Sequence, residues 1–263
     1  MKQDWNNYTN EDHAVWKLLF ERQLENLQDK AWSLYLDCIP LAGINADHVP
    51  DFLRVEKALA KNTGWKIEVV KGIIPVREFL ELLSEKKFCS STWLRKRHQL
   101  DYLEEPDMFH DTFGHIPLLA NEKYARFVQE FADLGLRFAA NEKAIFLLER
   151  LYWFTIEFGL MKENGAPKIY GAGILSSFGE SKHVFAENVR LKPFSIREVL
   201  FQPFHNNEVQ NTYFVVEDMN DLWNCLPETA SFLADFTAGK IPEAALRFEE
   251  QIGSAGTMET IAV

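Results

Sequence analysis

Apolar side chains recur at intervals of three and four residues along most of this 263-residue chain. That spacing places them on one face of an α-helix, whereas the alternation typical of half-buried strands is confined to short runs. We therefore expect a mainly α fold with small β elements, of the α+β class. The expected helices are 11–36, 49–60, 76–85, 121–138, 143–161, 195–200 and 229–236, and the expected strands are 65–69, 168–170 and 213–216.

The organisation along the chain is simple, because we find no internal repeat, low-complexity run or linker rich in Pro, Gly and Ser. We expect one domain over residues 1–263. Small and polar residues near the end predict a loose C-terminal tail at about 240–263.

The charge balance excludes several classes of function. Lys and Arg number 28 against 39 Asp and Glu, so the formal net charge is −11 and a surface for nucleic acid is not expected. No apolar run reaches the roughly 20 residues that a membrane helix needs, and the first residues do not form a signal peptide. The three cysteines, Cys38, Cys89 and Cys225, are too far apart for a zinc motif or a disulfide framework. A cytoplasmic protein without membrane partners is expected.

Two histidines around residues 106–117 suggest a metal site. A short helix is expected to begin at Pro106 and to end at Gly114, with His110 inside it and His115 just beyond. On an unbroken α-helix the two rings would lie about 140° apart, which suits no shared ion. A break at Gly114 would let His115 turn back towards His110. Ordinary hydrogen-bonded histidines remain the alternative at this point.

A third ligand is suggested by Glu157, which lies among aromatic and aliphatic residues of an expected helix. A buried carboxylate is costly unless it is paired, protonated or bound to a metal. An ion pair with Arg150 or Arg190 would also satisfy it. Two histidines and a carboxylate suit a non-haem ferrous ion with open positions, but a zinc hydrolase can use the same ligand types. The residues alone do not choose between these ions.

Four motifs, in order along the chain, resemble the pterin-dependent aromatic amino-acid hydroxylase family, and within it the bacterial members that act on phenylalanine. The resemblance runs from about residue 49 to the expected strand at 213–216. Its motifs are Trp93-Leu94-Arg95, the stretch 106–118 that contains both histidines, 152–160 around Glu157, and 170–177.

The resemblance implies a role for each matching residue. His110, His115 and Glu157 would bind iron, and Arg95 would bind the substrate carboxylate. Ser176, Trp153 and Phe158 would also line the substrate pocket. The pterin would be bound by residues of an expected loop and helix and by the acid after the first histidine. The loop and helix residues are Gly72, Ile74, Val76 and Phe79, and the acid is Asp111. Without the resemblance, Phe79 reads equally well as a core residue, the two pocket aromatics are more typical of the core, and Arg95 reads as a charge in a solvated loop.

The implied activity is that of an oxygenase of the aromatic amino-acid hydroxylase type. It would convert L-phenylalanine to L-tyrosine with Fe(II), O2 and a tetrahydropterin such as tetrahydrobiopterin, at an iron centre without a separate general base. The alternatives are a tryptophan hydroxylase of the same family, a zinc-dependent hydrolase with the same ligands, and a binding protein that only retains the pocket. A monomer is expected, because the family's C-terminal oligomerisation helix has no clear counterpart here.

Overall fold

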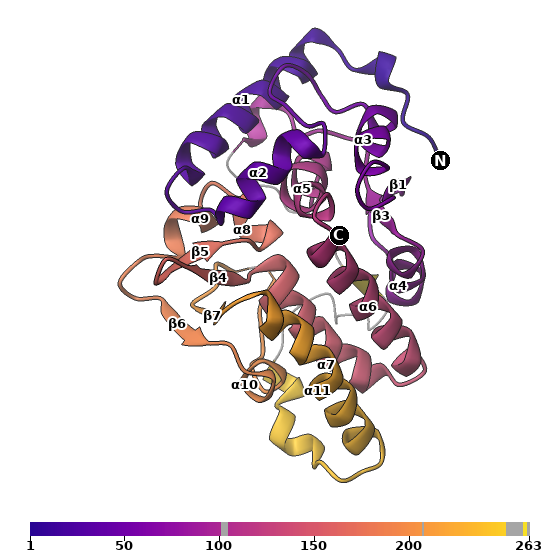
Figure 1. Cartoon of the computed structure of the whole chain (residues 1–263), viewed down its shortest axis with the longest axis vertical. Coiled ribbons are helices and arrows are strands. Elements are labelled where there is room, and N and C mark those ends of the chain that lie inside the picture. Colours follow the sequence, from indigo (N-terminus) through magenta and orange to yellow (C-terminus); the bar gives the residue numbers. More distant parts are fainter. Residues whose placement is uncertain (101–104, 207, 251–259, 262–263) are drawn as a thin grey trace.

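The structure is a computed structural model that describes residues 1–100, 105–206, 208–250 and 260–261, and helices dominate it (Figure 1). Several begin at a side chain that caps free backbone N–H groups, as Asn121 and Asn141 do by accepting from the residue three positions on. The α-helices are α1 Asn10–Leu27, α2 Ser33–Leu41, α3 Phe52–Leu59, α4 Val76–Ser84, α5 Ile116–Leu119, α6 Glu122–Phe138, α7 Glu142–Tyr152, α8 Ala172–Ser176, α9 Glu180–His183, α10 Ile196–Leu200 and α11 Met219–Thr237.

Six short helical turns complete the helical part of the described structure. Four are 3-10 turns and two are π turns, in which the backbone bonds from residue i to i+5. The 3-10 turns are η1 Trp5–Asn7, η2 Arg97–Gln99, η5 Glu243–Leu246 and η6 Phe248–Glu250, and the π turns are η3 His110–His115 and η4 Trp153–Glu157.

The strands form small sheets rather than one continuous layer. In the four-stranded sheet, β4 Leu160–Glu163 pairs antiparallel with β5 Ala166–Ile169 and parallel with β7 Thr212–Val216, which pairs parallel with β6 Arg190–Pro193. Strands β1 Lys66–Val69 and β3 Lys87–Ser90 pair in parallel, joined by a connection that includes α4. Strands β2 Ile74–Pro75 and β8 Thr260–Ile261 pair antiparallel. The predicted mainly helical α+β fold is confirmed.

The hydrophobic core is one cluster of buried residues that extends from α1 to η5, and α6 contributes to it. This helix packs against α4, α7 and α11, and α7 and α11 run alongside it in Figure 1, while α1 and α2 lie at the other end of the molecule. Phe127 and Phe131 of α6 are fully buried, as is Phe113 of η3. Cys38, Cys89 and Cys225 are free thiols and are also buried. Among the described residues, no helix has the length and apolar character needed to cross a bilayer.

The prediction of one helix over residues 11–36 is wrong. Helix α1 ends at Leu27, and the chain restarts as α2 at Ser33. Between them Lys30 O accepts from Ile169 N at 2.8 Å, and Trp32 N donates to Ile169 O at 2.8 Å. These bonds to the end of β5 replace helical ones, so a contact with a distant strand overrides the local helical pattern.

The prediction of a helix over residues 143–161 is wrong at its C-terminal end. Helix α7 ends at Tyr152, the π turn η4 follows, and β4 begins at Leu160. Gly159 lies between them in a tight space, where a Cβ atom would be 2.3 Å from the Thr155 carbonyl oxygen and 2.4 Å from Tyr170 Oη. Only glycine allows the backbone to turn into the strand at this close approach.

The expected tail at about 240–263 is described only in part. Residues 251–259 and 262–263 lie outside the described residues. Leu246 of η5 is fully buried in the core, and β8 pairs with β2. The single domain over residues 1–263 stays a prediction.

One buried acid on α7 provides a test of the packing. Burial raises the pKa of Glu149 from 4.5 to about 7, and its Oε2 has no hydrogen-bond partner among the described residues. The contribution of Glu149 to the free energy of unfolding is therefore fully present below about pH 4 and is lost as the pH rises through 7. The free energy of unfolding of Glu149→Gln, compared with that of the wild type, should therefore rise by about 3 kcal/mol from pH 4 to pH 8. Urea unfolding at both pH values checks this, and a difference independent of pH would contradict it.

Candidate metal centre

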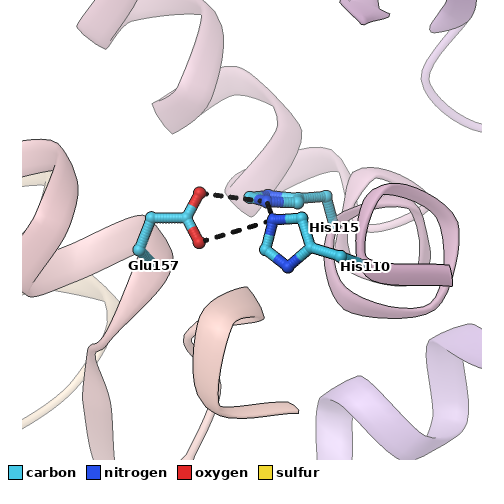
Figure 2. A group of neighbouring side chains, drawn as sticks. All are labelled: His110, His115 and Glu157. Atoms are coloured by element: carbon cyan, nitrogen blue, oxygen red, sulfur yellow. Dashed lines mark hydrogen bonds and ion pairs between the residues drawn. The ribbon is translucent and has the colours of Figure 1, made fainter. Parts of the chain in front are cut away.

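The two π turns bring His110, His115 and Glu157 together, and Figure 2 shows both imidazoles and the carboxylate pointing into one space. His115 Nε2 lies 3.2 Å from His110 Nε2 and 3.1 Å from Glu157 Oε1. His110 Nε2 lies 3.8 Å from Glu157 Oε2. One ligand atom from each side chain lies within 4.8 Å of the others, so a single ion can contact all three.

The way in which the histidines meet differs from the sequence prediction. The predicted break at Gly114 is wrong, because the chain stays helical from η3 into α5. In a π turn, residues five apart lie on one face, so His110 and His115 meet without leaving the helix. Gly114 instead allows close packing, since a Cβ atom there would lie 2.9 Å from the Ala172 carbonyl oxygen.

Hydrogen bonds fix the protonation of His110. Ser176 Oγ donates to Ala172 O at 2.8 Å and lies 2.8 Å from His110 Nδ1. Because the single hydroxyl proton is used, Ser176 accepts from His110 Nδ1–H, and the lone pair of His110 is at Nε2. Burial lowers the pKa of His110 to about 4, so the ring is neutral at pH 7. A neutral imidazole with a free Nε2 is the form that binds metals.

Glu157 supplies the negative charge of the cluster. Burial alone would raise its pKa, but His115 and His110 outweigh burial and hold the pKa below its ordinary value. Glu157 Oε1 is buried and has no hydrogen bond of acceptable geometry from the described residues. A cation would satisfy this oxygen, so the donor set fits a ferrous ion. The alternative pair with Arg150 is not found among the described residues; Arg150 donates to the carbonyls of Leu200 and Leu246.

Arg95 is held next to this cluster by a residue that the sequence reasoning missed. Asp107, which is fully buried, accepts from Arg95 Nε at 2.9 Å and from Arg95 Nη2 at 2.8 Å. Its carboxylate also accepts from the backbone N–H of Arg95 at 2.9 Å and of His110 at 3.3 Å. Arg95 is therefore a buried, oriented charge and not part of a solvated loop. The only available signal was the position of Asp107 three residues before His110.

Trp153 and Phe158 form part of an aromatic stack that begins in η4. Their rings stack with centroids 4.4 Å apart, and Phe204 stacks on Trp153 at 4.3 Å. Trp153 Nε1 donates to Gln210 Oε1 at 3.2 Å. The structure thus joins the two predicted pocket residues. Phe204 and Gln210, which hold Trp153 in place, were missed, because they lie about fifty residues further along the chain.

The predicted pterin residues are less closely gathered. Gly72 lies between β1 and β2, Ile74 in β2 and Val76 at the start of α4, and no hydrogen bond or ring contact among the described residues joins them to the metal cluster. Phe79 is fully buried, with its ring 5.7 Å from that of Tyr152.

Asp111 is the predicted pterin residue that lies beside the histidines. Its Oδ2 accepts from Ser91 N at 2.8 Å and from Ser90 Oγ at 3.2 Å, which ties η3 to the end of β3. Its Oδ1 is buried and has no partner among the described residues, and burial raises the pKa of Asp111 to about 7. An oxygen of this kind can accept from a ligand.

Comparison with known proteins agrees with this geometry. The model of the family described as biopterin-dependent aromatic amino acid hydroxylase matches residues 4–237. The phenylalanine-4-hydroxylase of Ralstonia nicotianae is 36% identical over 98% of this chain and 83% of its own length. Phenylalanine hydroxylase of Chromobacterium violaceum with bound Fe(III) superposes with a TM-score of 0.86 at 37% identity, covering 92% of this chain and 88% of that one.

A second structure of the C. violaceum enzyme holds both iron(III) and the oxidised cofactor 7,8-dihydrobiopterin. It superposes with a TM-score of 0.83 at 38% identity and covers 89% of this chain and 86% of that one. The match to the family model over residues 4–237 spans most of the chain, including the residues of both π turns. This chain therefore belongs to the biopterin-dependent aromatic amino acid hydroxylase family.

Proposed function

We propose that this protein is a phenylalanine 4-monooxygenase that converts L-phenylalanine to L-tyrosine with O2, ferrous iron and a tetrahydropterin. The observation that carries the proposal is the convergence of His110, His115 and Glu157 within a chain of this family. Relatives named phenylalanine-4-hydroxylase, and related structures that hold iron and dihydrobiopterin, support the substrate and the cofactors.

In this proposal the three side chains hold the iron on one side. The π turns place His110 and His115 on one helical face, and Glu157 approaches from η4. Three protein ligands leave the remaining positions of an octahedral ion open. Bound together, ferrous iron and the tetrahydropterin supply the activation of O2. The chain's own task is to orient the amino acid and to exclude water from the site.

Arg95, Trp153 and Phe158 are proposed to orient the amino acid. Asp107 engages Nε and Nη2 of Arg95, while among the described residues Nη1 contacts only Leu100 O, at 3.5 Å. The remaining guanidinium N–H groups can therefore bind the substrate carboxylate in a planar fork. The stacked rings of Trp153 and Phe158 offer a rigid apolar wall to the substrate ring.

The pterin is proposed to bind between Asp111 and the connection from β1 to α4. Asp111 Oδ1 would accept from the pterin directly or through water, and the backbone of Gly72, Ile74 and Val76 would meet its pyrimidine edge. Because Phe79 is fully buried, the pterin can stack on its ring only if neighbouring side chains move. This requirement makes Phe79 the least supported of the pterin residues.

The decisive test is anaerobic titration with ferrous iron, followed by an assay for tyrosine that depends on O2 and tetrahydrobiopterin. We expect one iron per chain and tyrosine formation only with all components present. A preference for tryptophan would identify a different ring hydroxylase of the family. Turnover of an ester or amide with zinc and without O2 would identify a hydrolase, and ligand binding without turnover would identify a binding protein.

Ser176 should contribute to iron binding through His110. Ser176→Ala removes the acceptor for His110 Nδ1–H, so the ring loses both its tautomer and its orientation. Partners of this kind are worth about 10–100-fold in metal affinity, and we expect that loss in a ferrous titration. Ser177→Ala, one residue further on, should leave the affinity unchanged. Equal affinity in both variants would contradict the orienting role.

We further propose that the protein acts as a cytoplasmic monomer. Three buried free thiols suit a reducing compartment. The exposed large apolar side chains of the described residues are scattered over separate elements, as Leu41, Leu53, Phe185 and Val209 illustrate, and single exposed apolar residues need no partner. A light-scattering mass near 30.5 kDa is expected.

A further inference from the structure

The segment that carries Arg95 has no regular secondary structure. Residues 91–96 form neither helix nor strand, so their position depends on the side chains packed against them. Asp107 holds Arg95 from one direction. A second set of contacts comes from residues 3–12, which we call the N-terminal segment.

Tyr8 is the central contact of the N-terminal segment. Its hydroxyl donates to the Thr92 carbonyl oxygen at 2.6 Å and lies 3.4 Å from Met108 Sδ. Met108 N in turn donates to the Trp93 carbonyl oxygen at 3.0 Å. One hydroxyl group therefore touches both the segment that leads into Arg95 and the segment that leads into His110.

The N-terminal segment is itself anchored elsewhere. The side-chain amide of Gln3 donates to Pro50 O at 2.8 Å and accepts from Phe52 N at 2.8 Å, at the start of α3. Trp5 Nε1 donates to Val49 O at 2.7 Å. Tyr8 is thus fixed by contacts that do not involve residues 91–96, and it can serve as an external support for them.

Two ion pairs fasten the other end of the Arg95 segment to the same region. Lys96 Nζ lies 2.8 Å from Asp12 Oδ1, and Arg97 Nε lies 2.8 Å from Glu11 Oε1. Asp12 also forms the capping box of α1 with Thr9. Its position is therefore set by the helix and not by Lys96. Arg95 lies between Thr92 and Lys96, the two residues that this region holds.

We propose that Tyr8 is a positioning residue for Arg95: its bond to Thr92 sets where the guanidinium meets the substrate carboxylate. This inference rests on the proposed role of Arg95 in binding the amino acid. Tyr8 touches neither substrate nor cofactor, so its effect should fall on the binding of phenylalanine and not on iron or on the chemical step.

The test is the KM for phenylalanine in Tyr8→Phe, Arg95→Lys and the double variant. Loss of one hydrogen bond predicts a rise of about fivefold for Tyr8→Phe, with kcat and iron stoichiometry unchanged. If Tyr8 acts through Arg95, Tyr8→Phe should add no further rise in the Arg95→Lys background. Asn7→Ala, which removes an exposed bond of the same segment to Asp4, is the matched control and should leave KM unchanged.

The possible outcomes separate the role of Tyr8 from the role of Arg95. An unchanged KM in Tyr8→Phe, beside a raised KM in Arg95→Lys, would overturn the role of Tyr8 and leave the proposed function intact. An unchanged KM in Arg95→Lys would overturn the role of Arg95 and the inference built on it. Equal effects of Tyr8→Phe and Asn7→Ala would mean general loosening, against the inference. Should Tyr8→Phe fail to fold, Lys96→Gln, which frees the same segment from Asp12, must raise KM instead.

Discussion

Replacing Glu157 by glutamine is expected to abolish tyrosine formation and to release iron from the protein. The amide has the shape of the carboxylate but lacks its charge, and two imidazoles alone bind ferrous iron weakly. Loss of one orienting partner costs about 10–100-fold in metal affinity, so loss of a ligand should exceed that range. Iron retained after gel filtration and the rate of tyrosine formation measure both effects.

Glu149→Gln is the matched control for this experiment. Glu149 is also a buried glutamate of the same helical stretch, two turns before Glu157, but it lies outside the proposed ligand set. It should retain full iron and activity at pH 7. Iron binding and activity in Glu157→Gln equal to those of the control would remove Glu157 from the ligands.

Asp107→Asn is expected to be the most destabilising single change at the substrate side. The substitution leaves the guanidinium of Arg95 buried without a negative partner, and breaking a buried ion pair in this way costs about 3–5 kcal/mol. The asparagine also presents N–H groups to donors that now bond to a carboxylate. We expect a lower free energy of unfolding in urea, together with a raised KM for phenylalanine.

The control for Asp107 is Asp235→Asn, which breaks an exposed pair with Lys240. Exposed pairs contribute about 0–1 kcal/mol, so this variant should unfold near the wild-type midpoint. If the free energy of unfolding fell by the same small amount in both variants, the Arg95–Asp107 pair would behave as a solvated contact. The proposed orientation of Arg95 would then lack its support.

The metal ligands could be predicted from residue types, but their geometry could not. Two histidines near a glycine and a glutamate among apolar residues were sufficient to suggest a site. The predicted means of bringing the rings together, a helix break at Gly114, assumed a helix of ordinary pitch. The structure uses π turns at both His110–His115 and Trp153–Glu157. No propensity in the local sequence distinguishes a π turn from an α turn.

The supporting residues depend on contacts between distant parts of the chain. Asp107, Tyr8, Gln210 and Phe204 act through their partners. Arg95 lies 12 residues before Asp107, and Thr92 lies 84 residues after Tyr8. Residue types alone gave Arg95 the character of a solvated charge, and the family resemblance assigned its role. The resemblance assigned residues that contact ligands, but it did not assign the residues that hold those side chains in place.

Helix boundaries followed the local signals where caps were present. Asn121 and Asn141 cap α6 and α7 close to the predicted starts. The helix predicted over 229–236 is the second half of α11, which begins at Met219 after the cap Asp218 and contains Pro227. Pro227 weakens the helical signal of the sequence in the first half of α11, but packing against α6 stabilises the helix.

The central claim is that His110, His115 and Glu157 share one ferrous ion whose other positions stay open to ligands. A crystal structure after anaerobic loading with Fe(II), read from the anomalous signal of iron, tests it most directly. The account predicts one iron per chain, bonded to both Nε2 atoms and to the Glu157 carboxylate, with only water at the remaining positions. Iron bound elsewhere, or enclosed on all sides by protein atoms, would contradict it.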